Sequence, residues 1–240
     1  RAPVGIPEVS VGVDLDGDRV GTSTEALSWD EVPEHLVVIG AGAIGLELGS
    51  VWRRLGAKVT VIEMLPQIAT LLDGQVARTL QRILKKQGLE FHLKTRVTGA
   101  EVANKKVKVQ IDKNGKEETL SFDRLLVAVG RRPLTRGLNL EETGIETDPK
   151  SGHVRVNEKF QTRVETIYAI GDLIAGPALA HKASAEGIAA VESMAGLSGE
   201  VNYDAVPAII YTAPEVASVG LTEEQIKERG VAYKTGTFPF

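Results

Sequence analysis

A glycine-rich turn between two apolar segments constrains the fold more than any other feature. Residues 36–39 are apolar and favour a buried strand, and glycines follow it at the spacing Gly-x-Gly-x-x-Gly, as Gly40, Gly42 and Gly45. Apolar residues then recur at helical spacing, which predicts a helix with Ile44, Leu48, Val51 and Leu55 on one face. A second strand is predicted over 58–62, with Glu63 directly after it. This order of strand, turn, helix and strand predicts a parallel βαβ unit.

The turn suits the pyrophosphate of a dinucleotide. Gly40 permits the tight turn, Gly42 lets a phosphate approach the backbone, and Gly45 allows the helix and strand to pack closely. The helix N-terminus adds free N–H groups and a positive dipole. Glu63 would accept hydrogen bonds from the adenosine ribose. An ordinary strand–helix turn with Glu63 on the surface is the alternative.

Glu63 also bears on the choice between NAD and NADP. A carboxylate at this position accepts bonds from a 2′-hydroxyl and repels a 2′-phosphate, and residues 64–66 contain no Arg or Lys. One charge-assisted hydrogen bond contributes roughly 1.5–3 kcal/mol. The sequence therefore predicts a preference for NAD of about ten- to a hundred-fold.

The remaining pattern predicts an α/β fold with an inserted antiparallel meander. Short strands are expected over 97–102, 107–111 and 119–122, with a hairpin turn at Asn114-Gly115, before an apolar strand over 124–129. Farther along, strands are expected over 154–162, 166–170, 208–212 and 215–219. A long helix is expected to open at Pro177 and run to about Met194. Asp73 is expected to cap the helix that follows it, and Thr222 starts a short helix with Gln225 at capping-box spacing.

A second candidate site lies at Gly171-Asp172, where the segment 166–170 ends. Asp172 would either accept hydrogen bonds from a polyol or cap a helix, and the residues alone leave both readings open. The N-terminus of the following helix, near Ala178 to Ala180, could face an anionic ring.

The composition excludes several functions for these 240 residues. They contain no cysteine, so thiolate catalysis, disulfides and zinc–thiolate sites are ruled out. The four histidines include no pair at helical ligand spacing, so no metal site is predicted. A net charge of −4 and 5% aromatic residues argue against nucleic acid as a partner. The apolar runs are too short to predict a membrane partner.

Five motifs in fixed order support a family resemblance. They are Gly-Ala-Gly-Ala-Ile-Gly-Leu-Glu-Leu-Gly (40–49), Leu-Val-Ala-Val-Gly-Arg-Arg-Pro (126–133), Ile-Tyr-Ala-Ile-Gly-Asp (167–172), Leu-Ala-His-Lys-Ala (179–183) and Tyr-Thr-x-Pro-Glu-Val-Ala-x-Val-Gly (211–220). Together they resemble the pyridine nucleotide–disulfide oxidoreductases, most closely the members that oxidise dihydrolipoamide. The resemblance covers nearly the whole chain.

The resemblance implies two sets of cofactor-binding residues. For NAD these are Gly40, Gly42, Ala43, Ile44, Gly45, Glu47, Glu63, Val97 and Gly130. Glu47 would meet the nicotinamide carboxamide, Val97 would lie near the adenine, and Gly130 would lie beside the nicotinamide part of NAD. A helix-surface charge and a core valine are the alternatives for Glu47 and Val97. At Ala43 many relatives carry a Tyr that gates the nicotinamide pocket, which puts that gate in doubt.

For FAD, the resemblance implies that Asp172 binds the ribityl chain. The stretch Ala178, Leu179, Ala180 and His181 would face the flavin pyrimidine edge. The family's FAD-pyrophosphate glycine motif, its Cys-x4-Cys pair and its His–Glu acid–base pair have no counterpart in these residues. No catalytic residue is therefore expected here.

These departures suggest an internal fragment of such an enzyme, inactive alone. The expected architecture is a Rossmann-type NAD-binding domain with the inserted meander, a partial FAD-domain segment and a partial α+β interface domain. The expected boundaries are 1–24 for the tail of the FAD domain or a linker, 25–150 for the NAD-binding domain, 151–199 for the returning FAD segment and 200–240 for the interface domain.

The implied activity is oxidation of dihydrolipoamide through FAD with reduction of NAD. The implied partners are a lipoamide-bearing protein of a 2-oxo acid dehydrogenase complex and a second copy in a homodimer. The expected compartment is the bacterial cytoplasm or the mitochondrial matrix. Another two-dinucleotide flavoprotein (an NADH oxidase, a soluble transhydrogenase or a mercuric reductase) and a non-catalytic NAD(H)-sensing module are the alternatives.

Overall fold

A computed structural model describes residues 6–7 and 12–238, in two compact units. The sheet unit comprises 9–128 and 209–240, and the α4 unit comprises 1–8 and 129–208. These units group residues by contact, and the four segments expected from the sequence stay a prediction. Part of the first segment, 1–24, lies outside the described residues.

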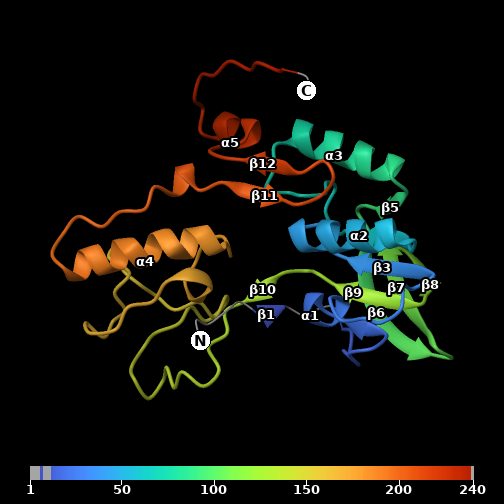
Figure 1. Cartoon of the computed structure of the whole chain (residues 1–240), viewed down its shortest axis with the longest axis horizontal. Helices are drawn as coiled ribbons and strands as arrows, with labels where there is room; N and C mark the ends of the chain where they lie inside the picture. The colour runs from blue at the N-terminus through green and yellow to red at the C-terminus, as the bar shows by residue number, and fades with distance from the viewer. Residues whose placement is uncertain (1–5, 8–11, 239–240) are drawn as a thin grey trace. The chain divides into compact units, whose positions relative to one another are not determined.

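The sheet unit is built on a five-stranded parallel sheet in the order β2-β9-β3-β4-β5 (Figure 1). The strands are β2 (Val20–Gly21), β9 (Arg124–Val127), β3 (His35–Ile39), β4 (Lys58–Ile62) and β5 (Leu89–His92). Ile39 pairs with both Ile62 and Val127, so three strands end at the same edge. The predicted parallel sheet is confirmed, and the turn after β3 lies at its carboxyl edge.

Helix α2 (Ala43–Leu55) is confirmed, but its predicted apolar face is only partly buried: Ile44 and Leu48 are half-buried, and Leu48 packs against the core. Val51 and Leu55 are 47% and 58% exposed. The helix instead buries a face rich in small residues, namely Gly45, Leu46, Gly49, Ser50 and Trp52. A helix face that carries glycines can approach the sheet more closely than a face that carries aliphatic side chains. The positions of the glycines, rather than those of the apolar residues, therefore determine which face of α2 is buried.

The predicted antiparallel meander is also confirmed. It consists of β6 (Arg96–Ala103), β7 (Lys106–Lys113) and β8 (Lys116–Phe122). Asn114 and Gly115 have φ angles of 57° and 79°, as a tight hairpin turn requires. Alternate residues of β7 are buried, which gives the sheet one apolar face and one exposed face.

The last part of the sheet unit folds onto helix α3 (Gly74–Lys86). It contains the two-stranded sheet of β11 (Ala208–Ile210) and β12 (Val216–Ser218), followed by α5 (Glu223–Glu228). Thr222 and Gln225 form the predicted capping box. Asp73, also predicted as a cap, accepts bonds from two helices: Oδ1 from the Gln75 N–H at 2.8 Å and Oδ2 from the Glu223 N–H at 3.1 Å.

The α4 unit has little regular structure apart from its long helix. Its elements are β1 (Ile6–Pro7) paired with β10 (Arg131–Arg132), the 3-10 turns η1 (Gly171–Leu173) and η2 (Tyr203–Ala205), and α4 (Ala180–Met194). The short helix α1 (Ser23–Ala26) belongs to the sheet unit. No helix in the described part of the chain is long and apolar enough to cross a membrane.

Two predictions in the α4 unit are wrong. The segments 154–162 and 166–170 are not strands, and they contribute only isolated bridges, Thr147–Val154 and Gln161–Tyr168. Their backbone groups are used in turns, as in the bond from the Ile167 N–H to the Val164 carbonyl, so no ladder forms. Helix α4 begins at Ala180 rather than Pro177, because the Pro177 carbonyl is taken up in a turn by the Leu179 N–H.

Asp73→Ala tests the double cap. The backbone bonds from Gln75 and then Glu223 lower the pKa of Asp73, so the ionised form is favoured in the fold. Its stabilisation is complete above the unfolded pKa and is lost as the pH falls through the folded pKa. We expect Asp73→Ala to lower the free energy of unfolding by about 1 kcal/mol at pH 7 and to have a smaller effect in acid, measured by denaturant unfolding. Exposed Asp30→Ala is the control, and an equal loss at both pH values would contradict this account.

Candidate functional site

The three glycines of the turn after β3 differ in their geometry. Gly40 has a φ of 101°, in the left-handed region that favours glycine. Gly42 is the exposed N-cap of α2, and a Cβ built on it would meet nothing within 4 Å. At Gly45 a Cβ would lie 2.1 Å from the Gly40 carbonyl oxygen, so helix and turn touch through their backbones. The turn is thus tightly packed at Gly45 and open to solvent at Gly42.

The N-terminus of α2 carries an uncompensated positive end. Gly42 has no side chain with which to cap the helix, and the first turn, which contains Ala43, Ile44 and Gly45, has no acidic residue. The first N–H groups of a helix have no partner within the helix, and they favour an anion. The open space at Gly42 adjoins these groups, so a phosphate would fit there.

Glu63 lies beside this turn and is bonded to it. Its Oε2 accepts a hydrogen bond from the Ala41 N–H at 2.8 Å, and its Oε1 accepts one from the Leu65 N–H at 2.8 Å. Both bonds fix the direction of the carboxylate. Each oxygen has a further lone pair, so both can still accept bonds from the hydroxyls of a diol.

Glu47 and Val97 lie elsewhere in the sheet unit. Glu47 is half-buried on α2, and its Oε1 accepts a hydrogen bond from the Tyr211 N–H at 2.8 Å. The bond to Tyr211, which the sequence did not predict, joins α2 to the segment after β11. Val97 is 8% exposed and pairs with Ile111, as a core valine would. The expected contacts with nicotinamide and adenine stay predictions.

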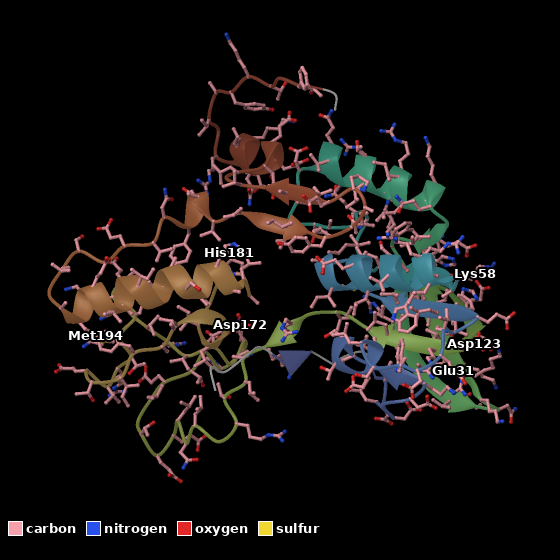
Figure 2. The ribbon with its side chains drawn as sticks, in the orientation of Figure 1. Glu31, Lys58, Asp123, Asp172, His181 and Met194 are labelled. Carbon is pink, nitrogen blue, oxygen red and sulfur yellow. The ribbon has the colours of Figure 1, made fainter. Side chains whose placement is uncertain are left out.

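The other predicted site residues belong to the α4 unit. Gly130 is exposed with a φ of 152°, and Asp172 is half-buried within η1. Ala178 and Leu179 precede α4, which opens with Ala180 and His181. Figure 2 shows Asp172 next to the N-terminal end of α4, where His181 is labelled. The His181 Nε2 lies 2.8 Å from the Pro207 carbonyl, which can only accept, so this nitrogen carries the proton.

The structure contains a buried network of charged side chains at Gly171 that the sequence did not predict. Lys182 and Glu186 on α4 are both 0% exposed, and Lys182 Nζ lies 2.9 Å from Glu186 Oε1. The Tyr203 hydroxyl donates to the same oxygen at 2.8 Å. Burial and this bond raise the pKa of Tyr203 to about 12, so the phenol stays neutral. Lys182 and Glu186 share the buried face of α4 with Ala189 and Ala190, whereas apolar periodicity assigns charged side chains to the exposed face.

Metal chemistry finds no support in the described residues. Among residues 6–7 and 12–238, no group of three or more His, Asp or Glu side chains could hold an ion. The arrangement can hold an anion at the start of α2 and a diol at Glu63.

Comparison with known proteins gives a consistent result. The family described as pyridine nucleotide-disulphide oxidoreductase matches residues 2–187, and the dimerisation domain of the same name matches 206–240. The mitochondrial dihydrolipoyl dehydrogenase of Homo sapiens is 53% identical over 233 residues, and that of Pisum sativum is 51% identical over 231 residues. Each alignment covers 95% of this chain and 46% of the relative, so the chain spans about half the length of these proteins.

Solved structures agree with this likeness. The crystal structure of LpdA from Mycobacterium tuberculosis superposes with a TM-score of 0.87 at 27% identity, covering 96% of this chain and 50% of that one. The Cu(II) complex of the HOCl-induced flavoprotein disulfide reductase RclA from Escherichia coli gives 0.84 at 28% identity, covering 95% and 51%. The predicted α/β fold class is confirmed by these neighbours.

Two glycine substitutions separate binding from packing. The Cβ of Gly42→Ala enters open space, so the stability cost should be limited to the poorer N-cap, about 1 kcal/mol or less. The same Cβ stands in the path of a phosphate, so NADH should bind about tenfold or more weakly. The Cβ of Gly45→Ala clashes with backbone, so it should cost about 1–3 kcal/mol of stability. Calorimetric titration with NADH and denaturant unfolding of the intact protein measure the two effects. Equal affinity in wild type and Gly42→Ala would contradict a phosphate at this turn.

Proposed function

We propose that this chain, which belongs to the pyridine nucleotide-disulphide oxidoreductase family, forms the NAD(H)-binding part of a dihydrolipoyl dehydrogenase. The family resemblance expected from the five motifs is confirmed, and members of this family use FAD and NAD. Relatives that are 51–53% identical carry the name dihydrolipoyl dehydrogenase, so the other flavoprotein activities and the sensing module are not favoured.

One observation carries the proposal. The carboxylate of Glu63 is held against the Ala41 N–H, beside the space left open by Gly42. A carboxylate next to an exposed helix N-terminus matches a ligand with a diol on one side and a phosphate on the other. The adenosine half of NAD has this combination, and a 2′-phosphate would meet the Glu63 charge directly.

Three further groups would orient the nicotinamide of NAD and the flavin of FAD. Glu47 uses Oε1 for the Tyr211 N–H, which leaves Oε2 to accept a bond from the nicotinamide carboxamide. Asp172 would accept bonds from the ribityl hydroxyls, and the first turn of α4 would stabilise negative charge at the pyrimidine edge. Bound FAD supplies two-electron transfer between a dithiol and the nicotinamide. Gly130 and Val97 would line the nucleotide on its nicotinamide and adenine parts.

The proposal extends to partners and compartment. Dihydrolipoamide is carried on a protein of a 2-oxo acid dehydrogenase complex, and such a protein is the proposed electron donor. The match of 206–240 to a dimerisation domain supports a homodimer. The curated relatives cited above are named as mitochondrial, which supports the mitochondrial matrix over the bacterial cytoplasm.

Glu63→Arg in the intact protein tests the nucleotide assignment. Replacing the carboxylate by a cation removes the ribose bonds and attracts a 2′-phosphate, so the ratio of NADH to NADPH affinity should fall by about tenfold or more. Titration of each nucleotide measures the ratio. Glu31→Arg makes the same charge change at an exposed position and is the control. An unchanged ratio in Glu63→Arg would remove Glu63 from the site.

A further inference from the structure

We propose that the buried Lys182–Glu186 pair is a positioning device that fixes the Gly171–Asp172 turn against the start of α4, and thereby sets the affinity for FAD. This inference rests on the proposed role of Asp172 as a flavin ligand. It assigns a function to two charged side chains that are outside the proposed set of flavin ligands.

The pair holds both polar backbone groups of one residue. Glu186 Oε2 accepts a hydrogen bond from the Gly171 N–H at 2.7 Å, and Lys182 Nζ donates one to the Gly171 carbonyl at 3.1 Å. The same carbonyl accepts a bond from the Ile174 N–H at 3.2 Å, which closes η1. Lys182 therefore holds the oxygen that shapes the turn containing Asp172.

Gly171 is packed closely against α4 in a backbone conformation that favours glycine. Its φ is 69°, and a Cβ on it would lie 3.1 Å from the Ala183 Cβ. The backbone of the turn thus rests directly on α4. Gly176 lies equally close to the Lys182 side chain, because a Cβ on Gly176 would lie 3.2 Å from the Lys182 Cε. The chain around the turn is fitted to the lysine as well as to the helix.

Stability alone does not explain two fully buried charges. Desolvation of a buried ion pair often offsets its attraction, and apolar residues of similar volume are commonly as stable or more so. What an apolar pair could not supply is a donor and an acceptor for the Gly171 backbone. The geometry of the turn, rather than the free energy of folding, is therefore the property that depends on these charges.

The position of the pair links the two parts of the candidate flavin site. Lys182 lies within the first turn of α4, next to His181, and Glu186 lies one turn later. The residues proposed to face the flavin ring begin this helix, and the residue proposed to hold the ribityl chain follows Gly171. The pair thus connects the first turns of α4 to Gly171, the residue directly before Asp172.

The test is FAD affinity in variants that remove the charges without leaving one unpaired. In Lys182→Met/Glu186→Met both bonds to Gly171 are lost, and in Lys182→Met/Glu186→Gln the Gln oxygen can still accept from the Gly171 N–H. The intact protein, freed of flavin, is titrated with FAD by flavin fluorescence. We expect the Kd for FAD to rise about tenfold or more in the first variant and by a smaller factor in the second.

Controls separate positioning from general damage. Glu223→Met/Lys227→Met removes a pair of the same i, i+4 spacing on α5, whose side chains are 33% and 59% exposed, and should leave the Kd for FAD unchanged. The Kd for NADH and the melting temperature of the flavin-free protein report on the remaining fold. If the first variant does not fold, the second decides the question alone.

Asp172→Asn distinguishes a failure of the positioning role from a failure of the flavin assignment. If Asp172→Asn weakens FAD binding but neither pair variant does, the positioning role is overturned and the flavin assignment stands. If Asp172→Asn leaves the Kd for FAD unchanged, the proposed function of Asp172 fails and the inference fails with it. Weaker FAD binding in the graded order, with NADH binding intact, supports the proposal.

Discussion

The hydrogen bond between the Glu63 carboxylate and the Ala41 N–H is the interaction on which the nucleotide site depends. It joins the end of β4 to the turn after β3, two points that the parallel register already brings to one edge of the sheet. The close backbone contact at Gly45 sets the helix on that turn, and Gly42 leaves its upper side open. The Glu63 carboxylate, the turn and the helix N-terminus thus lie side by side, so a diol and a phosphate would each have a partner.

The sheet unit was largely predictable because its signals are local. A glycine spacing, an acid after a strand, an Asn-Gly turn and two helix caps each specify a backbone conformation within a few residues. The buried face of α2 was not predictable from apolar spacing. Val51 and Leu55 follow the helical period but are exposed, because the close approach of Gly45 and Gly49 turns a different side of the helix toward the sheet.

The α4 unit shows the limit of the same reasoning. In α4 the charged residues Lys182 and Glu186 are buried, whereas Ile188 and Val191 are 64% and 62% exposed. Hydrophobic periodicity would assign the opposite faces. The burial of the pair depends on the Gly171 backbone, and no local pattern in residues 180–194 reports that long-range contact. The failed strands at 154–162 and 166–170 have a similar cause, since their backbone bonds close turns rather than ladders.

A crystal structure of the intact protein with NAD bound would test the central claim most directly. The account predicts pyrophosphate oxygens within hydrogen-bond distance of the first N–H groups of α2, over Gly42, and both adenosine ribose hydroxyls on the Glu63 carboxylate. A dinucleotide bound elsewhere, or a Glu63 side chain turned away from the ribose, would contradict it.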